Sequence, residues 1–216
     1  MRRPTWIAFD LNGTLLDPAA LLGSGREQAG QAALDDAVLQ AMADTLTGEH
    51  RPFPDYLRAA LERSLKTEGA DGNLLAGAMQ RAARLPAFAD AAPALETLAA
   101  AEYRIAVVTN SAAEAAGEAL RGASLDAYIE LVVGADEVGA YKPDPRVYRH
   151  AAGRLAAPEA EICLVAAHAW DVLGAMRAGW SAAWVAHREH HLLATVPPPA
   201  VAAASLIDAA RQLAAL

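Results

Sequence analysis

From residue 94 to residue 216, short apolar runs alternate with longer segments whose apolar residues have helical spacing. Such alternation predicts parallel βαβ units with right-handed crossovers. A further apolar run at 6–9 adds a first strand, and Pro197–Pro199 is expected to be a rigid connector to the last helix. The chain is therefore expected to be α/β, a Rossmann-like parallel sheet with helices on both faces. The other expected strands are 104–110, 129–133, 162–166 and 182–186, and the expected helices are 94–101, 112–121, 145–155, 172–178 and 205–216.

A long segment without strand character separates the first strand from the second. Apolar residues recur at helical intervals in three parts of it, 19–47, 56–65 and 73–84. Pro86 and Pro93 mark the return to the alternating pattern. Three helices between two strands predict an inserted all-helical cap over the sheet. The predicted domains are a core formed by 1–16 and 87–216 and a helical cap formed by 17–86.

Polar side chains are found where the expected strands end. In open α/β sheets, ligands bind outside the carboxyl ends of the strands, so residues from distant parts of the sequence are expected to meet there. A carboxylate in this position can act as a nucleophile toward carbon or phosphorus, and amide or hydroxyl groups can hold an anion. The polar residues at or near these ends are Asp10, Asn12, Thr14, Thr109, Asn110, Lys142, His168 and Asp171.

Each of these residues also has an ordinary structural explanation. Asp, Asn and Gly favour turns, and Asn110 or Ser111 could cap the following helix. Lysines generally lie on the surface, and an acid such as Asp171 is common in the first turn of a helix. Lys142 precedes Pro143, which restricts its backbone, so it could instead direct its ammonium toward Asp10.

In their order and spacing these residues resemble the haloacid dehalogenase (HAD) superfamily. Family sequences place a nucleophilic Asp in an Asp-x-Asp-Gly-Thr stretch, followed by a Thr or Ser, by a Lys before Pro, and by one or two acids. Asp10, Thr14, Thr109, Lys142 and Asp171 follow that order over nearly the whole chain. The resemblance implies that Asp10 is the nucleophile, that Thr14, Lys142 and Asp171 are also catalytic, and that the helical insertion is the family's cap.

Two departures from the family pattern affect the expected reaction. Phosphatases of this family have a second Asp two residues after the nucleophile, which protonates the leaving alkoxide, and the chain has Asn12 there. They also have a Mg²⁺-binding Asp four residues before the last acid, where the chain has Ala167. If Mg²⁺ binds, only Asp10, the backbone carbonyl of Asn12 and Asp171 remain to hold it. A Mg²⁺-dependent phosphatase of a small phosphorylated metabolite is therefore an alternative, and a weakened HAD-fold binding protein is another.

Dehalogenation needs neither missing group, because halide leaves without a proton and a carboxylate can displace it from carbon, forming an ester that water hydrolyses. Tyr148 and the stretch 169–175 resemble the L-2-haloacid dehalogenase branch of the family. The favoured hypothesis is a HAD-type hydrolase of this kind, with an aspartyl ester on Asp10 and no required cofactor. The expected substrate-binding residues are Asn12, Thr109, Asn110, Tyr148 and His168.

The resemblance to that branch is incomplete. Its fourth motif has Ser and Asn where the chain has Ala166 and His168, and its cap carries a halide-binding arginine that has no counterpart in 31–45. Arg26 could replace that arginine or be an ordinary exposed residue. The resemblance implies that Asp171 positions the hydrolytic water, while His168 could bind substrate, activate water or be structural.

Composition narrows the partners and the compartment. A formal charge of −8 argues against nucleic acid or an anionic membrane as partner. No apolar stretch approaches the ~20 residues that a membrane helix needs. The single cysteine, Cys163, excludes an internal disulfide and suits a reducing compartment. We therefore expect a cytoplasmic protein, and the family resemblance implies a monomer or homodimer that acts on a small anionic organic substrate.

Overall fold

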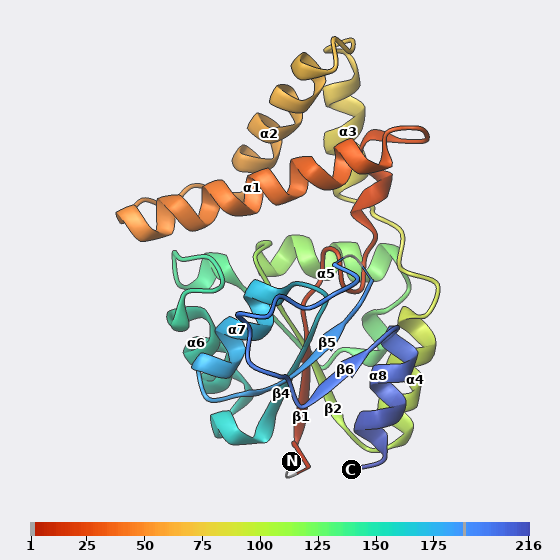
Figure 1. The fold of residues 1–216 in the computed structure, drawn as a ribbon, viewed down its shortest axis with the longest axis vertical. Helices are drawn as coiled ribbons and strands as arrows, with labels where there is room; N and C mark the ends of the chain where they lie inside the picture. Colours follow the sequence, from red (N-terminus) through yellow and green to blue (C-terminus); the bar gives the residue numbers. More distant parts are fainter. Residues whose placement is uncertain (1–2, 188) are drawn as a thin grey trace.

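The computed structural model describes residues 3–187 and 189–216 (Figure 1). The strands are β1 Trp6–Phe9, β2 Arg104–Thr109, β3 Leu131–Gly134, β4 Ile162–Ala166, β5 Ser181–Val185 and β6 Val201–Ala203. The α-helices are α1 Glu27–Thr47, α2 Phe53–Thr67, α3 Leu74–Ala82, α4 Ala91–Ala100, α5 Ala113–Gly122, α6 Pro145–Leu155, α7 Ala169–Arg177 and α8 Leu206–Ala214. Short 3₁₀ helices lie at η1 Pro18–Leu22, η2 Asp126–Tyr128, η3 Ala135–Glu137 and η4 Glu159–Glu161.

The strands form one parallel sheet in the order β3-β2-β1-β4-β5-β6. The chain builds outward from β1 in one direction through β2 and β3, and then in the other direction from β4. The order of the strands therefore reverses around β1, and ligands of doubly wound sheets bind at such a switch point. Asp10 directly follows β1, so it lies at this point.

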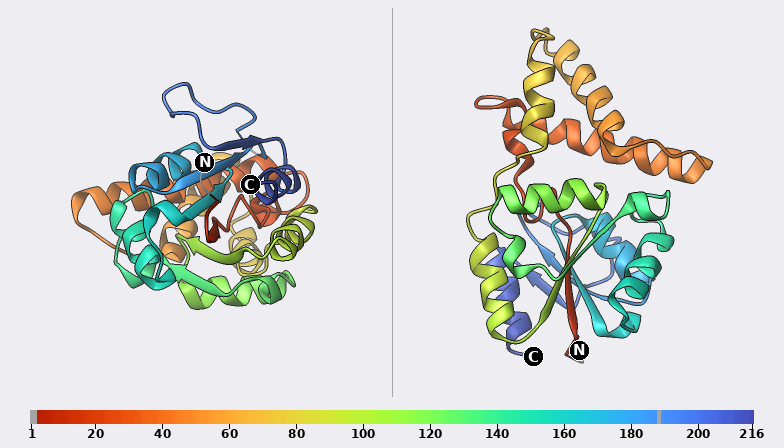
Figure 2. Two further views of the ribbon diagram at one scale, coloured as in Figure 1. Left: turned by 90° about the horizontal axis from the view of Figure 1, so that it is seen from below. Right: turned by 180° about the vertical axis from the view of Figure 1, so that it is seen from behind.

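Helices cover both faces of the sheet and bury β1 completely. Ile7 and Phe9 pack into a core shared with α4, α5 and α8, while Trp6 and Ala8 pack into a second core with α6 and α7. Figure 2 shows these two layers of helices from a second direction. Burial on both faces explains why 6–9 is continuously apolar rather than alternating. The predicted fold class, a Rossmann-like parallel sheet with an inserted helical cap, is confirmed.

The helical insertion lies over the carboxyl ends of the strands (Figure 1). The chain leaves and re-enters the core side by side, because Asp17 N donates to Pro86 O at 2.8 Å and Phe88 N donates to Leu15 O at 2.9 Å. Tyr141 also joins the two parts: its N–H donates to Thr45 Oγ1 of α1 at 3.1 Å. The domain bounds at 16–17 and 86–87 stay a prediction, which this close approach supports.

Several bounds of the secondary structure differ from the prediction by a few residues, and three of the differences have an identifiable physical reason. Helix α1 begins at Glu27 rather than near residue 19, because Gly23 and Gly25 have positive φ and end the preceding 3₁₀ helix. Helix α2 begins at Phe53, since Pro54 fits into a first helical turn rather than breaking it.

The third difference is a missed strand. Pro197–Pro199 leads into β6, which pairs with β5, and not directly into the last helix. Only three residues long and rich in alanine, β6 has little intrinsic strand preference and depends on the neighbouring strand. Among the described residues, no helix combines the length and hydrophobicity needed to cross a bilayer.

Candidate active site

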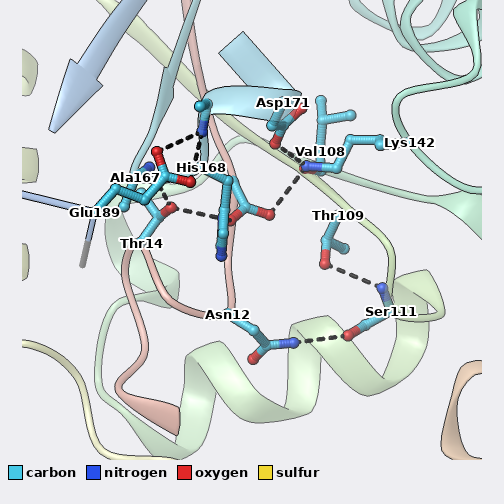
Figure 3. Close-up of polar contacts among 12 residues, drawn as sticks. Asn12, Thr14, Val108, Thr109, Ser111, Lys142, Ala167, His168, Asp171 and Glu189 are labelled. Carbon is cyan, nitrogen blue, oxygen red and sulfur yellow. Dashed lines mark hydrogen bonds and ion pairs between the residues drawn. The ribbon is translucent and has the colours of Figure 1, made fainter. Parts of the chain in front are cut away.

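The carboxylate of Asp10 is held by three side chains from different elements. Lys142 Nζ donates to Oδ1 at 3.0 Å, Thr14 Oγ1 donates to Oδ2 at 2.9 Å, and His168 Nδ1 lies 3.2 Å from Oδ2. Thr14 is itself oriented by the backbone N–H of Ala167, which donates to its hydroxyl at 3.0 Å (Figure 3). The side chain is buried yet borders a cavity, so the carboxylate is fixed in orientation and faces a space for a ligand.

Lys142 is fully buried and links two acids. Besides Asp10, its ammonium donates to Asp171 Oδ2 at 2.5 Å and to the carbonyl of Val108 at 2.8 Å (Figure 3). All three N–H bonds of the ammonium are thus used. Its backbone N–H donates to Asn110 Oδ1 at 2.8 Å, which ties this loop to the end of β2. The interpretation of Lys142 as a surface residue is therefore wrong.

Asp171 is fully buried behind Lys142. Its Oδ2 accepts from Lys142, and its Oδ1 accepts from the hydroxyl of Tyr148 at 2.7 Å. Gly174, one turn further along α7, permits this contact, because a Cβ there would lie 2.4 Å from the Tyr148 hydroxyl oxygen. Tyr148, expected among the substrate-binding residues, is thus directed at Asp171 and does not line the space beside Asp10.

This arrangement separates the proton affinities of the two acids. Burial alone would raise the pKa of Asp10, but the charge of Lys142 and the hydrogen bond with His168 hold it well below its usual range. Burial, together with repulsion from Asp10, raises the pKa of Asp171 despite the adjacent ammonium. Burial opposes the charge of Lys142, yet the two carboxylates raise its pKa. Asp10 is therefore an ionised carboxylate throughout the neutral pH range, as a nucleophile must be.

Three further polar residues predicted for the site, Asn12, Thr109 and Asn110, line the same cavity as Asp10. Asn110 Nδ2 is buried and has no hydrogen-bond partner among the described residues. Thr109 Oγ1 accepts from the backbone of Ser111, and Asn12 Nδ2 donates to the Ser111 hydroxyl at 3.1 Å (Figure 3). Neither Asn110 nor Ser111 caps α5 through its side chain. A buried amide without a partner is costly, so Asn110 is poised to donate to a ligand.

The cap closes this space with apolar groups. The cavity beside Asp10 has a volume of only about 20 Å³. The Arg26 guanidinium, considered as a substitute for the family's cap arginine, lies 3.4 Å from Glu68 within the cap and does not line this cavity. The lining residues are Asp10, Asn12, Thr109, Asn110, His168 and Trp170 from the core, and Leu34, Val38 and Phe53 from the cap.

Comparison with known proteins agrees with this geometry. Residues 4–179 match the family of haloacid dehalogenase-like hydrolases. The chain belongs to this family. It is 31% identical over 182 residues to (S)-2-haloacid dehalogenase 4A of Burkholderia cepacia, which covers 80% of this chain and 79% of the relative. It is also 31% identical over 182 residues to (S)-2-haloacid dehalogenase 1 of Pseudomonas sp. strain CBS-3, covering 80% of each chain.

A solved structure extends the similarity to the whole chain. A dehalogenase crystallised as an intermediate complex superposes with a TM-score of 0.92 at 27% identity, covering 99% of both chains. The protein is thus an L-2-haloacid dehalogenase-like hydrolase of the haloacid dehalogenase superfamily.

The donor set of this hydrolase does not fit a magnesium ion. Mg²⁺ requires octahedral oxygen ligands, and carboxylates are its usual protein ligands. Here the ammonium of Lys142 already bridges Asp10 and Asp171, and Ala167 offers only a methyl group. Among the described residues there is no cluster of three His, Cys, Asp or Glu side chains that could hold a metal.

Sequence reasoning missed several residues that shape the site. Gly174 lies in the stretch 169–175, which resembles the L-2-haloacid dehalogenase branch, and a glycine inside a helical pattern can indicate close packing. Ser111 and Trp170 also lay next to predicted site residues. The cap residues Leu34, Val38 and Phe53 carried no signal, because apolar residues at helical spacing look like ordinary core.

Proposed function

We propose that the protein hydrolyses the carbon–halogen bond of 2-haloalkanoic acids, with Asp10 as nucleophile and no metal. The observation that carries the proposal is an ionised carboxylate, Asp10, facing the same space as the unpartnered amide of Asn110. An amide donor suits the carboxylate of a small anionic substrate. The two relatives compared above are both (S)-2-haloacid dehalogenases, which supports the same substrate class.

In the first step, a carboxylate oxygen of Asp10 attacks C2 of the substrate. The new C–O bond forms as the carbon–halogen bond breaks, and the halide leaves with the bonding electrons, so the configuration at C2 is inverted. Lys142 and Thr14 hold the attacking carboxylate in one orientation, and Lys142 stays protonated throughout. The leaving halide faces the apolar cap residues of the cavity, which keep bulk water away from the reacting carbon.

In the second step, water attacks Cγ of the Asp10 ester and the 2-hydroxy acid departs. The attacking water must give up a proton. Asp171 is fully buried and both of its oxygens are engaged, whereas His168 lines the cavity with Nδ1 3.2 Å from Asp10 Oδ2. We infer that His168 accepts this proton and passes it to the oxygen of the departing 2-hydroxy acid, while the regenerated Asp10 carboxyl group loses its proton to solvent. Asp171 acts through Lys142, which it orients.

Replacing His168 tests this division of roles. His168→Asn introduces the amide that related sequences have, which can bind substrate but cannot accept a proton. We expect the alkylation step to continue while ester hydrolysis slows by about 10²-fold or more. The ester should then accumulate and be detected by mass spectrometry as an adduct on the peptide that contains Asp10. Turnover equal to that of the native protein, without adduct, would assign His168 to binding alone.

The proposed reaction itself is tested by halide release. Purified protein with EDTA should release chloride from the L-enantiomer of 2-chloropropionate and not from the D-enantiomer, and added Mg²⁺ should not change the rate. A parallel assay follows p-nitrophenyl phosphate with and without Mg²⁺. Metal-dependent phosphate release without chloride would establish the phosphatase alternative, and no reaction in either assay would favour a binding protein.

A further inference from the structure

A second cavity lies next to the space beside Asp10 and is much larger. Its volume is about 280 Å³, compared with about 20 Å³ at the nucleophile. Asn12, Leu34 and Phe53 line both cavities, so the two spaces adjoin at the boundary between the core and the cap. The small space holds little more than one water molecule, so most of a substrate must lie elsewhere.

The larger cavity is mainly apolar. Its two polar residues near Asp10, Asn12 and Ser111, are hydrogen-bonded to each other. Its one charged lining residue, Glu118, is exposed. Helices α1, α2 and α3 of the cap and α5 of the core supply its walls. The apolar lining residues are Leu11, Leu21, Leu34, Phe53, Pro54, Leu57, Met79, Ala82, Ala83, Leu85, Ala112, Ala115, Ala116 and Ala119.

We propose that the larger cavity binds an extended apolar substituent on C2 of the substrate, an inference that rests on the proposed function. With C2 beside Asp10 and the carboxylate at Asn110, a substituent that passes Asn12 and Phe53 enters this cavity. An apolar cavity of about 150 Å³ accommodates benzene, so 280 Å³ has room for a phenyl group or an alkyl chain of about six carbons. The preferred substrate is therefore a medium-chain or aryl-substituted 2-haloacid and not a two- or three-carbon one.

The size of the preference follows from burial. Each methylene transferred from water into an apolar cavity favours binding by about fourfold. We expect kcat/KM for L-2-bromooctanoate to exceed that for L-2-bromopropionate by roughly 100-fold, since the five added methylenes would be buried largely, not completely. Bromide release from both substrates, measured under identical conditions, gives this ratio. Equal or lower kcat/KM for the octanoate would overturn the inference.

Filling the cavity should remove the preference. Ala82 lies in α3 and lines the cavity, and Ala82→Phe would place a ring in it. We expect the octanoate-to-propionate ratio of kcat/KM to fall by about tenfold or more. Ala76→Phe is the matched control, because Ala76 lies on the same helix, is exposed and does not line the cavity; its ratio should equal that of the native protein.

Two further measurements keep the outcome decisive. Ala115→Phe fills the cavity from α5 at an exposed position, so it remains informative if Ala82→Phe does not fold. A preference that survives in every folded cavity-filling variant would contradict the inference.

Binding of the reaction products is measured separately by thermal melting: 2-hydroxyoctanoate should raise the Tm of the native protein more than 2-hydroxypropionate does. That shift without any halide release would refute the proposed function while supporting the apolar site, and no difference in shift would count against the site itself.

Discussion

Asp10→Asn should abolish halide release, lowering kcat by roughly 10⁴-fold or more, because an amide is not a nucleophile toward carbon. The substitution preserves the shape of the side chain. It also leaves Lys142 paired with the carboxyl group of Asp171 at 2.5 Å. The variant should therefore fold, which circular dichroism and thermal melting would verify. Asp126→Asn, at an exposed position away from the site, is the matched control and should keep native activity.

Isotope labelling separates a covalent role of Asp10 from an electrostatic one. In a single turnover in H₂¹⁸O with protein in excess over substrate, the oxygen of the 2-hydroxy acid comes from the Asp10 carboxylate and is ¹⁶O. The ¹⁸O enters Asp10 when water hydrolyses the ester at Cγ, and mass spectrometry of the peptide detects it. Label in the product after this first turnover would mean that water attacks the substrate directly, and Asp10 would then not be the nucleophile.

The fold could be predicted from the sequence because its signals are local and repeated. Each buried parallel strand is a continuous apolar run, and each crossover helix has its own spacing of apolar residues. The short strand β6 was not predicted, because its three residues are stabilised by pairing with β5 and have little intrinsic preference for a strand. The start of α2 was also placed wrongly from the sequence, because Pro54 is compatible with either a helix break or a first helical turn.

The candidate site could be predicted only in part. The topology of a parallel sheet explains why Asp10, Asn110, Lys142 and His168 meet, since all follow or adjoin strand ends. The topology does not show in which direction each side chain points. The hydroxyl of Tyr148 contacts Asp171 because Gly174 leaves room for it. This tertiary contact cannot be predicted from either residue alone.

The contribution of the cap was also beyond prediction from the sequence. Its apolar residues divide into those that fill its own interior and those that line the cavities above Asp10. Leu34 of α1 and Leu61 of α2 are both buried residues of cap helices, yet of the two only Leu34 lines the cavities. This difference depends on how the cap sits on the core, and substrate specificity therefore rests on the least predictable part of the chain.

Lys142→Met should cause the largest loss of stability of any single substitution in the site. The variant keeps the apolar stem but leaves Asp10 and Asp171 buried without their ammonium, and breaking a buried ion pair in this way costs about 3–5 kcal/mol. Urea denaturation at pH 7.5 should reveal this decrease in the free energy of unfolding. The control is Lys66→Met, which removes an exposed lysine in α2 and should change stability by less than about 0.5 kcal/mol.

The pH dependence of that loss identifies its cause. In the native protein the pKa of Asp10 is lowered in the folded state, so its contribution to stability is present at neutral pH and is lost as the pH falls through the folded-state pKa. The pKa of Asp171 is already raised in the native protein. Without Lys142, burial should raise it further and should also bring the pKa of Asp10 above its unfolded value, so that the folded variant binds more protons than the unfolded chain. The variant should then gain stability relative to the native protein between pH 7.5 and pH 5. A deficit that is the same at both pH values would mean that lost packing, and not two unpaired carboxylates, destabilises the variant.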